Sequence, residues 1–263
     1  MKIYQSNLLS NFENLTHAFT SRDGGISKAP YNSLNLAFHV GDNPLDAEKN
    51  HQLLASKLNY KLKNLVHMKQ IHSSTVHSVD TQDDFNHPPT CDALITNKVD
   101  TPIMVMVADC TPVLFYDKKK QVIAVAHVGR EGAFKNIIKN VINSFRDDFD
   151  SNTKDIVVAV GASIGVCCYE IGLDLYEQTK ALNLSYSVEK RGSKYYLDIG
   201  KIIQKQLSEC KIQKTNIDNF NICNCCNSDR YFSYRANQTT GRFCGVMMLK
   251  RLYLTPLITN TLQ

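Results

Sequence analysis

The sequence lacks any apolar stretch that could cross a bilayer. The longest such runs, for example residues 103–108, are far shorter than the roughly 20 residues that a transmembrane helix needs. Residues 1–15 lack the basic, apolar and small-residue zones of a signal peptide. No segment repeats at a solenoid period, and none is of low complexity. These absences argue against a helical membrane protein and a repeat array, and they predict a soluble cytoplasmic protein.

The sequence also lacks a concentrated basic region. Lys and Arg number 30 against 25 Asp and Glu, which gives a net charge of +5, and the basic residues are scattered apart from 118–120. This distribution is too weak for a nucleic-acid footprint, so we expect neither a nucleic-acid nor a membrane partner. It is compatible with a small anionic substrate.

Cysteine, by contrast, is abundant. The nine cysteines are an odd number, which argues against a complete disulfide framework, and in a reducing compartment they stay thiols or become metal ligands. The segment CNCC (223–226) contains a C-x-x-C, which is half of a zinc ribbon. Because no second C-x-x-C accompanies it, we interpret these residues as free thiols and do not pair Cys167 or Cys168 with them.

Turn residues and apolar periodicity predict alternating helices and strands. Asn43 and Pro44 give the cap and first position of a helix that runs to about residue 58. Further helices are expected over 134–145, 174–182 and 198–210, strands within 65–79 and over 112–117, 121–127, 155–161 and 245–249, and a turn at 129–132. No linker divides the chain, so residues 1–263 are expected to form a single mixed α/β (α+β) domain of layered sheets covered by helices.

A β-hairpin predicted within 103–127 places Cys110 near His127. If the charged DKKK stretch (117–120) forms the loop, an antiparallel ladder with a constant index sum sets these two residues directly opposite each other. Opposite residues share a face, with Cβ atoms ~4.5–5.5 Å apart. The inference depends on loop length, because a slip of one residue sends the two side chains to opposite faces.

A thiolate and an imidazole are typical zinc ligands. Catalytic zinc usually has three protein ligands and one open position, so we expect a third ligand among His67, His72 and His77. Alternatively, the Cys110–His127 pair works without metal, as nucleophile and base of a hydrolase.

Several segments resemble motifs of the bacterial YfiH-type, or laccase-domain, family. QIHS (70–73) is similar to the family's QVHG, ADC (108–110) matches its ADC, and GASIGVCCYEIG (161–172) is similar to its GPSIGPCCYEVG. Further segments that fit the family are FTSRDGGIS (19–27), YNSLNLAFHVGDNP (31–44), AHVGREG (126–132) and RYFSYRANQTTGR (230–242). These motifs follow the family's order and span most of the chain.

The resemblance implies a zinc site made by His72, Cys110 and His127, with water or substrate at the open position, in a fold whose sheets are sandwiched between helices. Members have been described as purine nucleoside phosphorylases with accompanying adenosine deaminase and methylthioadenosine phosphorylase activity. Others have been described as multicopper polyphenol oxidases or as peptidoglycan-precursor editing factors. The leading expectation is a zinc-dependent enzyme that splits adenosine- or inosine-type nucleosides with phosphate and also deaminates adenosine.

The residues expected to bind substrate are Arg22, Asn35, Arg130 and Arg235. A guanidinium matches phosphate bidentately, which makes Arg22 and Arg235 candidate phosphate clamps. Asp109, beside the cysteine ligand, is a candidate catalytic proton carrier, although alternation along a strand would point it to the opposite face.

The chain departs from the family pattern in two places. The family's Trp-Arg is Arg130-Glu131 here, and its Tyr-Arg-Arg is Tyr234-Arg235-Ala236. Arg130 therefore stands one position earlier than the family arginine and is its candidate replacement.

Copper is the alternative metal, because blue-copper sites also use two histidines and a cysteine. A multicopper cluster needs many more histidines, and the eight in this chain include no His-x-His pair, so copper oxidation ranks below zinc nucleoside chemistry. A Cys/His hydrolase that edits peptidoglycan precursors and a non-catalytic metal-binding module remain further alternatives.

Overall fold

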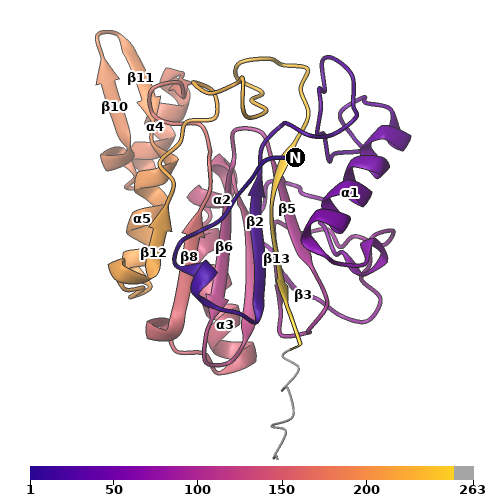
Figure 1. Ribbon diagram of the computed structural model, residues 1–263. Helices are drawn as coiled ribbons and strands as arrows, with labels where there is room; N and C mark the ends of the chain where they lie inside the picture. Colours follow the sequence, from indigo (N-terminus) through magenta and orange to yellow (C-terminus); the bar gives the residue numbers. More distant parts are fainter. Residues whose placement is uncertain (252–263) are drawn as a thin grey trace, which may run out of the picture.

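The computed structural model describes residues 1–251, in which two β-sheets are stacked between helices (Figure 1). The first sheet is antiparallel, in the order β1-β2-β13-β5. The second has the order β12-β8-β6-β7-β4-β3, with parallel pairing at its two edges. A small third sheet, β10-β11-β9, projects beside α4. The strands are β1 Ile3–Tyr4, β2 Leu15–Thr20, β3 Val76–Ser78, β4 Ala93–Thr96, β5 Ile103–Val107, β6 Thr111–Asp117, β7 Val122–Val128, β8 Ile156–Val160, β9 Glu170–Ile171, β10 Val188–Arg191, β11 Lys194–Leu197, β12 Ile217–Asn219 and β13 Phe243–Leu249.

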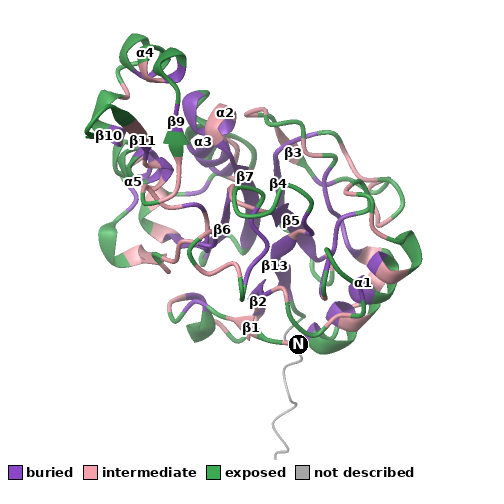
Figure 2. Ribbon diagram, turned by 90° about the horizontal axis from the view of Figure 1, so that it is seen from above, coloured by how far each residue is buried: buried purple, intermediate pink, exposed green. Residues whose placement is uncertain are grey.

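Strand alternation divides the interior into layers. Along β6, Val113 and Phe115 belong to the core beneath the helices, whereas Leu114 and Tyr116 belong to the core between the sheets. Successive strand side chains point to opposite faces, so a strand that is buried on both faces reads as a continuous apolar run. Figure 2 shows these buried strands at the centre and exposed residues around the periphery.

The described part of the chain contains five α-helices. They are α1 Pro44–Leu58, α2 Arg130–Phe134, α3 Ile137–Phe149, α4 Leu173–Ala181 and α5 Ile199–Glu209. Leu54 and Leu58 of α1 pack on the first sheet, while α3 and α5 pack on the second. Asn43 and Asp198 cap α1 and α5 through their side chains. The predicted mixed α/β architecture of sheets between helices is confirmed.

The β6–β7 hairpin differs from the prediction in register. Asp117 pairs with Val122, and Pro112 rather than Cys110 lies opposite His127. The predicted register is therefore wrong by two residues, because the loop lies one residue further along the chain at each end. Since strand side chains repeat every two residues, this shift leaves the faces unchanged.

One further expectation is wrong. Residues 129–132 do not form a turn, because α2 begins at Arg130 with Gly129 as its N-cap. The strand expected within 65–79 is present as the short β3, with isolated bridges before it. None of the described helices has both the length and the apolar composition needed to cross a membrane.

Candidate metal centre and cavity

The predicted site lies where the central strands β6 and β7 meet at one end of the second sheet. β7 ends at Val128 where its antiparallel neighbour β6 begins at Thr111, so the chain before β6 and the end of β7 are adjacent. Cys110 directly precedes β6, and His127 is the penultimate residue of β7. His72 comes from the loop before β3, where its backbone has a positive φ of 57°.

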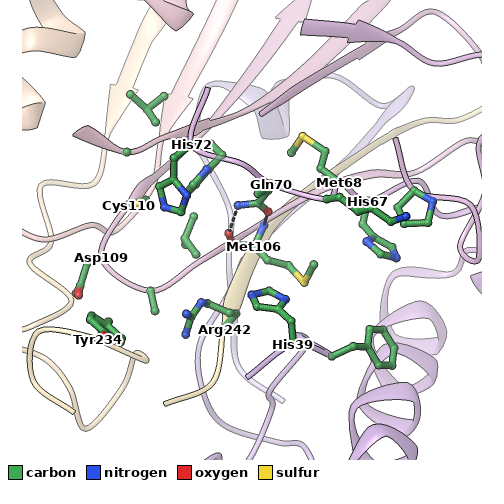
Figure 3. Close-up of a pocket in the computed structure, with 18 of the residues that line it drawn as sticks. His39, His67, Met68, Gln70, His72, Met106, Asp109, Cys110, Tyr234 and Arg242 are labelled. Carbon is green, nitrogen blue, oxygen red and sulfur yellow. Dashed lines mark hydrogen bonds between the residues drawn. The ribbon is translucent and has the colours of Figure 1, made fainter. Parts of the chain in front are cut away.

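His72, Cys110 and His127 come together in space. Their ligand atoms all lie within 4.8 Å of one another. The two imidazole rings meet edge to face, with centroids 4.8 Å apart. Figure 3 shows His72 and Cys110 side by side at one end of a cavity. Two imidazoles and one thiolate with an open side match the donor set of a catalytic zinc site, so these residues fit such an ion.

Asp92 holds the backbone of His72 and the ring of His127. This carboxylate is fully buried; its Oδ1 accepts hydrogen bonds from the His72 N–H (3.0 Å) and from His127 Nδ1 (2.8 Å). Its Oδ2 accepts the N–H (2.6 Å) and hydroxyl (2.7 Å) of Ser73. With Nδ1 donating to Asp92, the Nε2 of His127 is left to bind a metal, as in carboxylate–histidine–zinc arrangements.

The hydrogen bonds at Asp92 lower the pKa of its carboxyl more than burial raises it. Burial raises the pKa of this carboxyl, but hydrogen bonds from His127 and Ser73 lower it to about 2. Asp92 was not predicted as a site residue. The sequence feature that could have identified it is its position in the apolar run CDALI (91–95). A carboxylate that is buried in such a run needs hydrogen-bond partners.

The thiol and imidazole favour their charged forms. Burial raises the pKa of Cys110, but the neighbouring His127 and His72 lower it to about 6. Burial lowers the pKa of His127, but Cys110 and Asp92 raise it to about 9. The thiolate is the form that binds metal or attacks as a nucleophile, so this pairing supports both predicted chemistries.

The cavity has a volume of about 1200 Å³, large enough for a drug-sized molecule. One part of its wall is apolar and includes Phe38, Met68, Phe85 and Met106. Gln70 fixes this wall: its amide accepts the Met106 N–H at 2.9 Å and donates to the Met106 carbonyl at 2.8 Å (Figure 3). The loop that carries His72 is thereby tied to β5.

The cavity includes two of the four predicted substrate-binding residues. Arg130 and Arg235 line it, and each already has partners: Arg130 is paired with Glu131 at 2.9 Å. The Arg235 guanidinium donates to the carbonyls of Cys168 (3.0 Å) and Glu170 (3.2 Å).

Arg22 and Asn35 are not among the lining residues. The Arg22 guanidinium donates to the carbonyls of Asn32 and Ser228 and lies 4.8 Å from the centroid of the Phe232 ring. The structure therefore places Arg22 in contacts between loops, away from the cavity wall.

Asn35 acts on the cavity through Arg242. Asn35 is fully buried, and its Oδ1 accepts the Arg242 N–H at 2.9 Å. Arg242 lines the cavity and is labelled in Figure 3, near His39. Burial lowers the pKa of Arg242, and the nearby Cys110 and Asp109 act to raise it. Arg242 was missed as a site residue although it ends the segment 230–242 that carries Arg235.

Asp109 also lines the cavity, at a positive φ of 90°. It lies outside the regular strand, so the alternation that would have turned it away from Cys110 does not apply. Its Oδ1 accepts from the Ser233 hydroxyl (2.6 Å) and the Asn224 amide (3.0 Å), and its Oδ2 accepts the Arg235 N–H (2.7 Å). The carboxylate thus holds two parts of the β12–β13 connection against the site.

The chain is similar to known proteins along most of its length. A family model described as multi-copper polyphenol oxidoreductase laccase matches residues 16–250. The purine nucleoside phosphorylase YfiH of Escherichia coli is 31% identical over 232 residues, covering 88% of this chain and 92% of that protein. A purine nucleoside phosphorylase of Corynebacterium glutamicum is 34% identical over 235 residues, covering 89% and 94%.

The fold is also similar to solved structures. The crystal structure of the hypothetical protein YfiH from Bacillus licheniformis matches with a TM-score of 0.85 at 26% identity, covering 90% of this chain and 93% of that one. The structure of YlmD from Geobacillus stearothermophilus matches with a TM-score of 0.83 at 26% identity, covering 91% and 93%.

Proposed function

Because the chain belongs to the multi-copper polyphenol oxidoreductase laccase family, we propose that it is a zinc-dependent purine nucleoside phosphorylase that also deaminates adenosine. Relatives with 31% and 34% identity are named purine nucleoside phosphorylases. The observation that carries the proposal is the convergence of two imidazoles and a thiol at the end of a large cavity that also contains arginines.

In this proposal His72, Cys110 and His127 hold the zinc ion. A zinc ion in such a site supplies Lewis acidity and lowers the pKa of its water toward ~7. Asp92 holds the backbone of His72 in place, and its hydrogen bond with His127 Nδ1 fixes the tautomer whose Nε2 faces the site.

Arg242 is the proposed phosphate-binding residue, with Arg130 and Arg235 beside it on the cavity wall. An ionic contact is stronger where water is excluded, and Arg242 is partly buried. Its Nη1 donates to the carbonyls of Thr240 (3.1 Å) and Gly241 (3.0 Å), which hold the guanidinium in place. Asn35 and Arg22 then serve as positioning residues for the loops behind this wall.

The apolar wall is the proposed binding surface for the purine. Phe38, Phe85 and Met106 offer an apolar and polarisable environment that shields a base from water. Asp109, the predicted proton carrier, has both carboxylate oxygens occupied by protein donors, so its proposed role is to orient the Arg235 loop.

Polyphenol oxidation with copper is the second candidate, favoured by the description of the family. Two histidines and one cysteine suit a single copper ion. Of the described residues, those grouped as metal ligands place at most two histidines together, fewer than a multicopper cluster uses. The geometry therefore favours a site for one ion, and nucleoside chemistry ranks first.

The test measures metal content together with phosphate-dependent release of base from adenosine and inosine. Wild type, Cys110→Ala and the control Cys210→Ala are compared, since Cys210 lies outside the cavity lining. We expect Cys110→Ala to lose about one zinc ion per chain and its turnover of nucleosides. The control Cys210→Ala should keep its zinc content and its turnover. Turnover of phenols with copper, or hydrolysis of cell-wall precursors in place of nucleosides, would contradict the proposal.

A further inference from the structure

Four cysteines converge at a second place, and none of them is among the residues that line the cavity. The Sγ atoms of Cys167, Cys168, Cys223 and Cys226 all lie within 4.8 Å of one another. Cys226 Sγ is 3.4 Å from that of Cys167 and 3.3 Å from that of Cys168. From the sequence we did not pair Cys167 or Cys168 with the C-x-x-C at 223–226. That interpretation is wrong, because the structure brings all four residues together.

The topology explains why these cysteines meet. β8 and β12 are parallel neighbours, so the loops that follow them leave the sheet at the same edge. The Ser163 N–H donates to the Ile222 carbonyl at 3.1 Å, which extends the contact beyond the strands. A pair of cysteines 55 or more residues away in sequence is thereby brought to a C-x-x-C, which supplies the missing second half of a four-cysteine site.

A tight turn lets two adjacent cysteines face the same way. The N–H groups of Cys168 and Tyr169 both donate to the Gly165 carbonyl, at 3.0 and 3.1 Å. In a strand, neighbouring side chains would point to opposite faces, whereas this turn directs Cys167 and Cys168 toward Cys226.

We propose that Cys167, Cys168, Cys223 and Cys226 bind one zinc ion in a closed, structural site. Four thiolates in a tetrahedron are typical of structural zinc, in contrast to the three ligands of the cavity site. Zn–S bonds of ~2.3 Å place sulfur atoms roughly 3.8 Å apart, close to the separations observed here. Each thiol that binds gives up its proton to solvent, and no redox step is involved.

Backbone N–H groups support this assignment. Cys223 Sγ accepts the N–H of Gly165 at 3.2 Å and that of Cys226 at 3.5 Å. Such donors orient and stabilise metal-bound thiolates.

Gly165 leaves the space that the sulfurs occupy. A Cβ at this position would lie 3.2 Å from Cys167 Sγ and 3.3 Å from Cys223 Cβ. The backbone therefore approaches the thiols closely only because residue 165 has no side chain. Such close packing of the backbone against the thiols is expected around a bound ion, and free thiols do not require it.

The site would stabilise one wall of the cavity. The Cys168 carbonyl accepts from Arg235 Nη1 at 3.0 Å, and the Asn224 amide donates to Asp109 Oδ1 at 3.0 Å. Cys168 and Asn224 belong to the two loops that the four-cysteine cluster joins, the loop after β8 and the connection after β12. The proposed ion is therefore structural, and its presence does not depend on which reaction the cavity performs.

The test separates the two sites by mutation. In the variant His72→Ala/His127→Ala we expect about one zinc per chain, with an X-ray absorption spectrum of four sulfurs at ~2.3 Å. Adding Cys223→Ser and Cys226→Ser should remove this zinc. Cys225→Ser is the matched control from the same loop, and it should retain the ion because Cys225 is not part of the group of four.

A second measurement covers the case in which the serine variants do not fold. Cobalt(II) added to the metal-free His72→Ala/His127→Ala protein should give intense thiolate-to-metal charge-transfer bands, and zinc should displace it and raise the Tm. Absence of those bands, zinc-free protein, or a disulfide within the group in freshly purified protein would overturn the proposal. Loss of zinc in Cys225→Ser would overturn this ligand set.

Discussion

Replacement of Asp92 by Asn tests whether one buried carboxylate holds the two candidate zinc-ligand histidines. The change keeps the shape of the side chain but exchanges one acceptor oxygen for an NH₂ donor. Oδ2 accepts three hydrogen bonds, two from Ser73 and one from the Ile71 N–H. We expect the remaining oxygen to stay there, so that the new NH₂ faces the His72 N–H and His127 Nδ1.

The expected magnitude follows from the charge that Asp92 carries. Its pKa of about 2, against 3.8, corresponds to about 2.4 kcal/mol in favour of the charged form. Loss of one partner of a buried ionic pair costs about 3–5 kcal/mol, so the free energy of unfolding should fall by about 2–4 kcal/mol. The NH₂ group also forces His127 to accept at Nδ1, which puts its proton on Nε2. Zinc affinity should therefore fall about 10–100-fold.

Urea unfolding of metal-free protein and zinc competition against a chelator measure the two effects separately. Asp117→Asn is the matched control, because Asp117 is also fully buried but ends β6 far from Cys110. Its Oδ1 accepts two backbone N–H groups of the hairpin loop. The control should lose stability and keep its zinc affinity. If Asp92→Asn loses stability and still binds zinc like wild type, the carboxylate serves the fold alone and the reasoning is refuted.

Three further predictions concern the cavity and the response to acid. Gly129→Ala should weaken zinc binding about 10–100-fold without lowering the Tm. The added Cβ would lie 2.9 Å from Cys110 Sγ, whereas the backbone φ of −84° suits alanine. Chelator competition measures the zinc affinity, and thermal melting measures the Tm. Arg242→Met should raise the KM for phosphate roughly 10–150-fold, because a charge-assisted hydrogen bond contributes about 1.5–3 kcal/mol. Initial rates measured against phosphate concentration test this, and an unchanged KM would exclude Arg242 as the clamp. Stability should fall as pH drops from 6.5 toward 4, because burial lowers the pKa of His17 to about 4 and that of His51 to about 3. The unfolded chain takes up protons in this window and the native protein does not, so each histidine costs at most about 2 kcal/mol by pH 5. Urea unfolding at pH 7 and pH 5 measures the difference, and a flat profile would contradict the burial of neutral imidazoles.

The helices were largely predictable because their signals are local. The cap at Asn43 and the proline after it mark the start of α1, and Asp198 marks that of α5. Strands such as β2 and β4 were missed because they are short and their partners are distant in sequence. β13 near the chain end lies between β2 and β5, and no local pattern carries that information.

The convergence of the three candidate ligands was predictable, and the surroundings of the site less so. A register error of two residues preserves strand faces, so Cys110 and His127 still meet. His72 came from the family motif, since spacing alone left three histidines open. Arg22 was chosen for its residue type, which does not say whether a guanidinium meets a ligand or a backbone carbonyl. The structure shows the latter.

The four-cysteine cluster and the candidate metal centre in the cavity are joined by the segment around Asp109. The Asp109 carbonyl accepts the Ile164 N–H at 2.8 Å, and its carboxylate accepts from Asn224. Its positive φ costs about 1–3 kcal/mol and persists only where neighbours fix it. Cys110 is the next residue, so loosening the four-cysteine loops should misplace this ligand and weaken metal binding in the cavity. Coupling between binding sites is reciprocal, so metal at the cavity must then strengthen zinc binding to the cysteines by the same factor.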